Sequence, residues 1–101
     1  TEFYSTCNPD LIEDQILANL KVHGVQPKTS EGKYKIKFDM MSKDNSGNNQ
    51  EVKMVIRILR VDDSKYAIEF VKLAGDQFRF LEHFNKFRKD VLSSLNDSTL
   101  E

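Results

Sequence analysis

The chain has 101 residues, of which 39% are hydrophobic and 31% are charged, and its formal net charge is −1. This length fits one domain with a single core and is too short for two. The balanced charge argues against a strongly basic nucleic-acid binder, and no apolar run reaches the roughly eighteen residues of a membrane-spanning helix. We therefore expect a single domain over residues 1–101 with the composition of an ordinary soluble protein.

Cys7 is the only cysteine, so an internal disulfide is impossible. A lone thiol is more typical of a reducing compartment, and we expect the protein in the nucleus and cytoplasm. No base stands beside Cys7 in the sequence, which favours an idle or packing thiol over a reactive nucleophile. The chain starts at Thr1 rather than Met and shows no signal peptide, so we expect a fragment of a longer protein.

The first predicted helix spans residues 9–23. Asn8 offers a side chain that can cap its first N–H groups, and Pro9 suits the first helical position. Apolar residues then recur at helical spacing, and Gly24 suits the left-handed conformation that often ends a helix. The aromatic pair at residues 3–4 is interpreted as a short lead-in to this helix.

Three stretches alternate apolar and polar side chains in the pattern of strands with one buried and one solvated face. They are residues 33–41, 52–61 and 65–73. Polar residues 42–50 are typical of a hairpin loop, and residues 62–64 of a tight turn. Residues 25–28 are a candidate for a further strand, at an edge. Leu59 and Val61 shift the apolar set by one position, which indicates a bulge or a two-sided central strand.

The last predicted helix lies within residues 75–95, where Gly75 breaks the strand pattern and Asp76 can cap the helix. A broad apolar stripe that includes Phe80, Phe84 and Phe87 must lie against another element. Two such helices and a half-buried antiparallel sheet fit a two-layer α+β fold in the order α-β-β-β-β-α. Both helices then cover one face of a sheet of four, or even five, strands. We expect a monomer.

The sequence contains no recognisable catalytic or metal-binding pattern. His23 and His83 stand sixty residues apart, and neither has a Cys or carboxylate neighbour at metal-ligand spacing. The Asp62-Asp63 pair is better interpreted as part of a solvated turn than as a metal or acid pair. We predict that this chain alone is not an enzyme and uses no cofactor and no metal.

The strongest positional signal for binding is the solvated face of the predicted sheet. Five cations are expected there: Lys33, Lys35, Lys37, Lys53 and Arg57. Such a patch favours an acidic protein surface or an anionic phospholipid headgroup. The competing interpretation, that exposed strands simply need polar residues, has about equal weight. Nucleic acid ranks lowest because no exposed aromatic residues are interleaved with the cations.

The order of elements and the Gly-Asp entry to a phenylalanine-rich last helix resemble the kinase-associated-1 domain, found at the C-terminus of several Ser/Thr protein kinases. Within that family the chain is most similar to the C-terminal regulatory domain of the DNA-damage checkpoint kinases. The residues that carry the resemblance are Thr1-Glu2-Phe3-Tyr4, Val61-Asp62-Asp63, Glu69-Phe70, Gly75-Asp76, Phe80, His83-Phe84 and Lys86.

This resemblance implies a non-catalytic regulatory domain that binds and autoinhibits its own kinase domain, in the DNA damage response and cell cycle arrest. The two family motifs implicated in that contact fall on Phe3, Tyr4, Gly75, Asp76, Phe78, Arg79, Phe80, His83, Phe84 and Lys86. Glu2 and the Leu81-Glu82 pair stand where the family motifs carry basic residues. These departures argue against a basic import signal and against an anionic ligand at the last helix.

Two other functions stay open at this point. Related domains bind anionic phospholipids through basic patches, which here implies the cations of the solvated sheet face. A similar fold serves as a C-terminal domain that docks on partner subunits in a metabolic-stress kinase. A kinase domain upstream of Thr1, followed by a linker rich in Ser-Gln or Thr-Gln sites, would favour the checkpoint interpretation.

Overall fold

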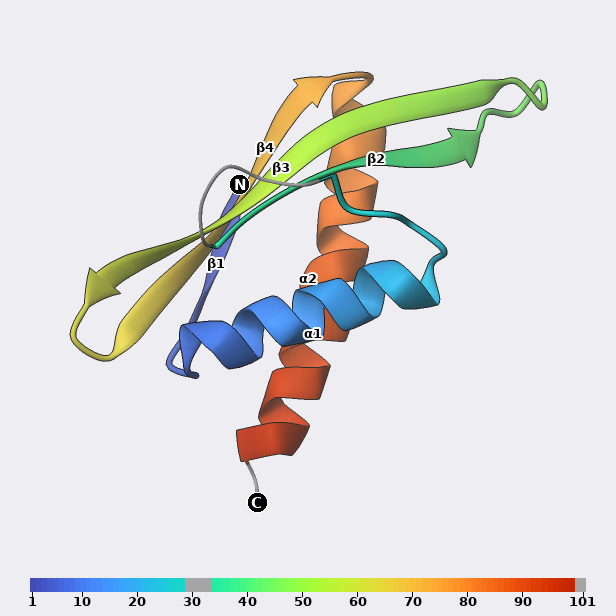
Figure 1. The fold of residues 1–101 in the computed structure, drawn as a ribbon. Coiled ribbons are helices and arrows are strands. Elements are labelled where there is room, and N and C mark those ends of the chain that lie inside the picture. Colours follow the sequence, from blue (N-terminus) through green and yellow to red (C-terminus); the bar gives the residue numbers. More distant parts are fainter. Residues whose placement is uncertain (29–33, 100–101) are drawn as a thin grey trace.

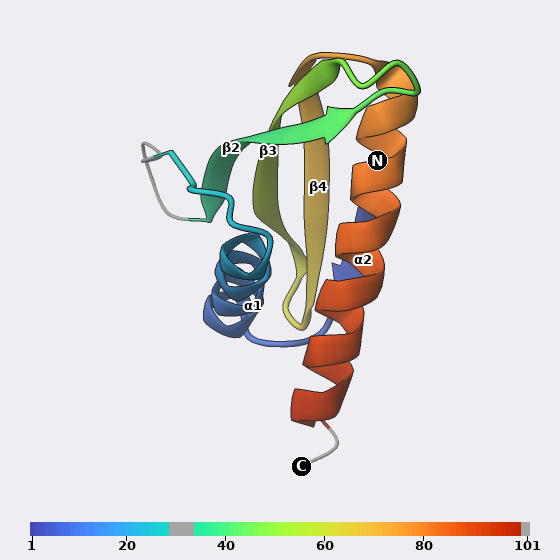
Figure 2. The same ribbon diagram turned by 90° about the vertical axis from the view of Figure 1, so that its right-hand side faces the viewer.

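The structure is a computed structural model that describes residues 1–28 and 34–99, with side chains described as far as residue 95. The described residues form an antiparallel sheet with strand order β1-β4-β3-β2 and two helices (Figure 1). In chain order the elements are β1 (Glu2–Ser5), α1 (Pro9–Val22), β2 (Lys35–Lys43), β3 (Asn49–Asp62), β4 (Lys65–Ala74) and α2 (Gln77–Thr99). Both helices lie on the same side of the sheet, and α1 runs across α2 (Figures 1 and 2).

The predicted α+β class is confirmed, but the fourth strand is at the N-terminus. The residues predicted as a lead-in form β1, which pairs with the edge of β4 and places Phe3 opposite Ile68. The candidate strand at 25–28 instead makes one bridge, in which the Lys28 N–H donates to the Lys37 carbonyl at 2.7 Å. The order is therefore β-α-β-β-β-α. Burial of Phe3 in the core, which four residues of alternation could not predict, explains the difference.

Both helices begin as the sequence predicts. The Asn8 side chain accepts a hydrogen bond from the Asp10 N–H at 2.8 Å, and Gly24 after α1 has a φ of 70°. At the start of α2, the Asp76 carboxylate accepts from the Arg79 N–H at 2.9 Å. Each cap satisfies a backbone donor that the helix itself leaves unpaired, which fixes where the helix starts.

Gly75 joins β4 to α2 where the chain passes closely over β3. Its φ is 113°, and an added Cβ would lie 2.6 Å from the Glu51 carbonyl oxygen and 2.9 Å from the Val52 Cα. Both atoms are backbone and cannot rotate away. A glycine is therefore required here by conformation and by space together.

The predicted bulge is also present, since the β3–β4 register shifts between Arg60 and Asp62.

The aromatic rings of α2 fill the space between the sheet and α1. Phe87 is 5.7 Å from the Phe38 ring of β2, 6.1 Å from the Phe70 ring of β4 and 5.8 Å from His23 after α1, all measured between centroids. From α1, the buried residues are Ile12, Ile16 and Leu20. A buried phenylalanine stabilises a fold by about 1.5–3 kcal/mol, so α2 is a main source of stability.

Among the described residues, no helix is long and apolar enough to span a membrane.

Candidate functional site

The residues implicated in a kinase contact divide into core residues and surface residues. Phe3 and Phe80 are only 4% and 3% exposed, and Phe84 is also buried, so these three rings serve the core. Asp76 caps α2, as described above. On the surface, Phe78 is 72% exposed, and Tyr4, Arg79, His83 and Lys86 are exposed or half-buried.

The two predicted motifs meet only in the core, where the ring centroids of Phe3 and Phe84 lie 6.4 Å apart, and their exposed residues are on separate surfaces. Tyr4 pairs opposite Ala67, whereas α2 follows the other end of β4 at Ala74. Seven residues of strand at about 3.3 Å each separate these positions by roughly 23 Å. Tyr4 is also engaged locally, because the Lys65 ammonium lies 4.5 Å from its ring centroid. The start of α2 is therefore a separate surface from β1.

We define the α2 start surface as Phe78, Arg79, Leu81, Glu82 and Lys86. Phe78 and Leu81 are three residues apart and adjacent on the helix, and both are exposed. They are apolar and stand next to two cations and one carboxylate. This mixture of an exposed aromatic ring and charged neighbours is typical of a protein-binding surface.

A polar pocket of about 210 Å³ opens beside this surface. Its lining consists of Ser42, Arg79, Glu82, His83 and Lys86. The Ser42 Oγ and His83 Nε2 atoms are buried, and neither has a hydrogen-bond partner among the described protein atoms. Leaving a buried polar group unsatisfied costs about 1–3 kcal/mol, so a hydrogen-bond partner for either atom would stabilise the protein.

The electrostatics of the polar pocket favour a neutral His83. Burial lowers the pKa of this imidazole below its ordinary value, and the positive charges of Lys86 and Arg79 lower it further, while the Glu82 carboxylate opposes them. A neutral imidazole donates a hydrogen bond from one ring nitrogen and accepts at the other. The sequence does not predict this pocket, because polar residues 42–50 indicate a hairpin loop, whereas Ser42 lies in β2.

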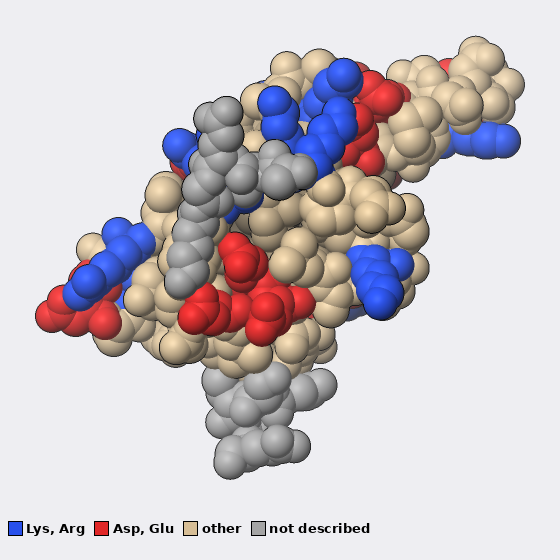
Figure 3. Space-filling model, in the orientation of Figure 1, with Lys and Arg blue, Asp and Glu red and all other residues tan. Residues whose placement is uncertain are grey.

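The predicted basic patch lies on the outer face of the sheet, away from the helices, but part of its charge is neutralised. Arg57 donates through Nε to the Glu69 carboxylate at 2.8 Å, and Lys53 lies 3.8 Å from Glu51. Lys33 lies outside the described residues. In Figure 3, which views the molecule from the side that carries α1, blue side chains lie beside red ones along the upper part of the molecule. The strand register that sets Glu69 opposite Arg57 was not predictable from charge alone.

Two lysines of this face keep their charge free of ion pairs among the described residues. Lys35 and Lys37 border a shallow hollow of about 280 Å³ on the outer face. Its remaining lining residues are Val55, Arg57, Val71 and Leu73. The hollow thus combines cationic side chains with an apolar floor, which suits an anionic group attached to an apolar one.

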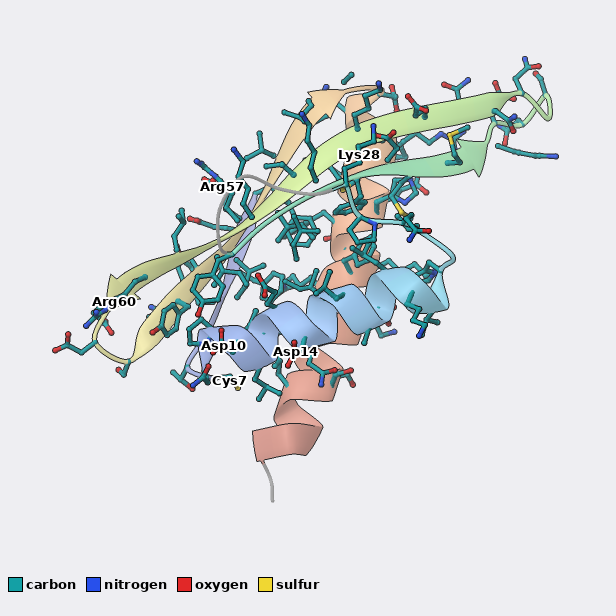
Figure 4. The ribbon with its side chains drawn as sticks, viewed as in Figure 1. Cys7, Asp10, Asp14, Lys28, Arg57 and Arg60 are labelled. Atoms are coloured by element: carbon teal, nitrogen blue, oxygen red, sulfur yellow. The ribbon has the colours of Figure 1, made fainter. Side chains whose placement is uncertain are left out.

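An acidic cluster on α1 has a structural role. The Tyr34 hydroxyl donates to Asp10 Oδ1 at 2.7 Å, and the Tyr34 N–H donates to Glu13 Oε2 at 3.1 Å. Figure 4 shows Asp10 and Asp14 along the exposed side of α1. These bonds hold the start of β2, where Tyr34 has a φ of 64°, against α1. In the part of the chain that the structure describes, no group of His, Cys, Asp and Glu could hold a metal ion.

Many solved structures share this fold, among them the following two. The first is a chain from the crystal structure of the adenylate sensor of AMP-activated protein kinase in complex with the ribofuranotide ZMP; it matches with a TM-score of 0.69 and 14% identity, over 92% of this chain and 94% of that one. The second is the vertebrate conserved region of human METTL16, with a TM-score of 0.62 and 12% identity, over 92% of this chain and 96% of that one. No protein-family model and no curated protein sequence matches the chain. At these identities, the likeness shows a shared fold.

Proposed function

We propose that this chain is a non-catalytic regulatory domain of a Ser/Thr protein kinase of the DNA-damage checkpoint, and that it inhibits its own kinase domain by binding it through the α2 start surface. The observation that carries the proposal is Phe78, whose ring is 72% exposed and fills no place in the core. Two further observations support a kinase as the parent protein. The chain shares its fold with the adenylate sensor of AMP-activated protein kinase, and its motifs resemble those of kinase-associated-1 domains.

The α2 start surface is well suited to a tight contact because it is rigid. The close approach of Gly75 to β3 and the cap by Asp76 fix the first turn of α2, so binding costs little loss of conformational freedom. Aromatic residues at the centre of protein interfaces often contribute 2 kcal/mol or more, on the order of a thirtyfold change in affinity. We expect Phe78 to be such a residue.

The test adds the purified chain to the isolated catalytic domain of its parent kinase and measures phosphorylation of a peptide substrate. We expect inhibition by the native chain, and Phe78→Ala should raise the half-inhibitory concentration at least about tenfold. Val22→Ala on α1 is the matched control, because Val22 is 81% exposed and lies outside the α2 start surface. Absence of inhibition at several hundred micromolar, or equal inhibition by Phe78→Ala, would exclude the proposal.

A second candidate function is binding of anionic phospholipid through the outer sheet face. The observation that favours it is the hollow bordered by Lys35 and Lys37, which has an apolar floor. A lysine near an anionic membrane contributes about 1 kcal/mol, so replacing both by alanine should weaken sedimentation with phosphatidylserine vesicles roughly thirtyfold. The matched control replaces Lys21 and Lys89, which lie on the helices. Binding that both double variants retain equally would refute this function.

The fold shared with the adenylate sensor also favours a third function, docking on the partner subunits of a metabolic-stress kinase. The same α2 start surface would serve it. Co-purification of the chain with its parent kinase separates the cases. A single polypeptide that is inhibited intramolecularly supports the checkpoint assignment, and a stable complex of several subunits supports the metabolic one.

A further inference from the structure

We propose that the polar pocket binds the phosphate of a phosphorylated serine or threonine, carried by an extended peptide that pairs with the free edge of β2. The polar pocket shares Arg79, Glu82 and Lys86 with the α2 start surface and adds Ser42 and the β2 backbone. This proposal goes beyond the kinase contact, and its test needs no kinase domain. Two features carry it. The first is a set of polar and cationic side chains around the polar pocket, and the second is the edge of β2, which is unpaired among the described residues beyond the bridge at Lys37 and ends beside the pocket.

The donors of the polar pocket match a phosphate group better than a carboxylate. Arg79 and Lys86 supply two positive charges, and the buried Ser42 Oγ and His83 Nε2 atoms lack a partner among the described protein atoms. A phosphate monoester carries about −1.5 to −2 charge at pH 7 and three acceptor oxygens, so it can accept from both cations and, once their side chains turn toward the pocket, from Ser42 and His83. Arginine adds a planar fork that can bind two of those oxygens together.

Glu82 also lines the polar pocket and partly offsets the two cations. Leu81-Glu82 stands where the family motif carries a basic pair, and this difference predicted that no anionic ligand binds at the last helix. The cations of the polar pocket come from positions on either side of that pair and outnumber the one carboxylate of the lining, although the Asp44 carboxylate also interacts with Arg79. Glu82 should nevertheless weaken binding of free phosphate, and the peptide backbone must supply part of the affinity.

The outer edge of β2 can supply that backbone contact. Because the Lys37 carbonyl accepts from Lys28, the backbone groups of every second residue from Lys37 onward face away from β3. Those of Asp39 and Met41 have no described hydrogen-bond partner on this edge. An extended peptide can add there as a further strand, with main-chain hydrogen bonds giving affinity.

The geometry places the end of this edge at the polar pocket. Ser42 is near the end of β2 and faces the helices, and the end of β2 lies close to the start of α2 in Figure 2. Side chains of an added strand alternate between the two faces, so every second one points to the helix side. A phosphorylated residue opposite the end of β2 would therefore reach Arg79 and Lys86.

A peptide fits this arrangement better than a lipid headgroup does. The polar pocket opens on the helix side of the sheet, whereas Lys35 and Lys37 lie on the outer face, so one flat membrane surface cannot use both. An inositol phosphate has no backbone to pair with β2. Specificity should come from the phosphate in the pocket and affinity from the strand edge.

The test passes a degenerate library of nonapeptides with a fixed central phosphoserine or phosphothreonine over the immobilised chain. The unphosphorylated library, inorganic phosphate and inositol trisphosphate are the comparison probes. We expect at least about tenfold more retention of the phosphorylated library. We also expect ¹⁵N–¹H resonances of Ser42 and His83 to shift on addition of the retained peptides.

Three variants make the result specific. Lys86→Gln and Ser42→Ala should each reduce retention of the phosphorylated library severalfold. The control is Lys89→Gln, which removes a cation of α2 outside the polar pocket and should leave retention unchanged. Met41→Pro removes an N–H that faces the free edge. Proline is tolerated there because no hydrogen bond to β3 is lost. This variant should retain less peptide, while its circular dichroism spectrum stays that of the native chain. Equal retention of both libraries overturns the proposal, as does binding of inositol trisphosphate without phosphopeptide. Unchanged retention by Met41→Pro overturns the strand pairing.

Discussion

The substitution Gly75→Ala tests how α2 is attached to the sheet. The new Cβ would lie 2.6 Å from the Glu51 carbonyl oxygen and 2.9 Å from the Val52 Cα, far inside van der Waals contact. The φ of 113° adds backbone strain of about 1–3 kcal/mol for any residue with a side chain. Overpacking against atoms that cannot rotate away adds about 1–3 kcal/mol. We expect the free energy of unfolding to fall by about 2–6 kcal/mol.

A loss of this size is large for a small domain, whose net stability is about 5–15 kcal/mol. Urea denaturation followed by circular dichroism measures it directly. At about 4–8 °C per kcal/mol, the smallest expected loss lowers the melting temperature by about 8 °C or more.

Gly47→Ala is the matched control. Gly47 in the β2–β3 hairpin has a φ of 81°, but an added Cβ there meets no atom within 4 Å. It therefore carries the backbone strain alone, about 1–2 kcal/mol. If Gly75→Ala destabilises the protein no more than Gly47→Ala does, the close approach to β3 is not what requires the glycine.

Three further changes have definite expected outcomes. Phe87→Ala removes a fully enclosed ring and should lower the free energy of unfolding by about 3–5 kcal/mol in urea denaturation, whereas the exposed Phe78→Ala should change it by less than about 0.5 kcal/mol. Asn8→Ala removes the α1 cap and should cost about 0.5–2 kcal/mol, seen as a lower urea midpoint; an unchanged midpoint would mean that water replaces the cap. Because burial lowers the pKa of His83 in the folded state, its contribution to stability is complete above the ordinary value of 6.5 and declines as the pH falls below it. Melting temperatures of His83→Gln should then depend less on pH in that acidic range than those of the native chain, and parallel curves would contradict the assignment.

The sequence was sufficient for the features that local chemistry determines. Asp76 and Gly75 marked the start of α2, and alternation identified the three long strands, because caps and periodicity act over a few residues. The position of β1 required knowing that Phe3 fills a gap beside Phe70 and Phe84, which lie far along the chain. The four residues of β1 alternate over too short a stretch to predict a strand.

The candidate sites depended on pairings that the sequence does not specify. Lys35, Lys37, Lys53 and Arg57 lie on the strands that the sequence predicted, and Lys33 is outside the described residues. The register that sets Glu69 opposite Arg57 and so reduces the charge of the patch is a property of the assembled sheet. The polar pocket joins Ser42 of β2 to residues of α2 about forty positions later. Only the folded arrangement puts their side chains around one space.

The place of β1 also constrains how the protein acquires its fold during synthesis. The strands β2, β3 and β4 are joined by short connections and can pair as soon as they are made, since local contacts form fastest. Phe3, in contrast, must wait for Ile68, 65 residues later. At about 5–20 residues per second, a ribosome needs roughly 3–13 s to reach that point. Throughout this interval β1 lacks its partner strand, and the sheet closes on that side only after β4 has been made.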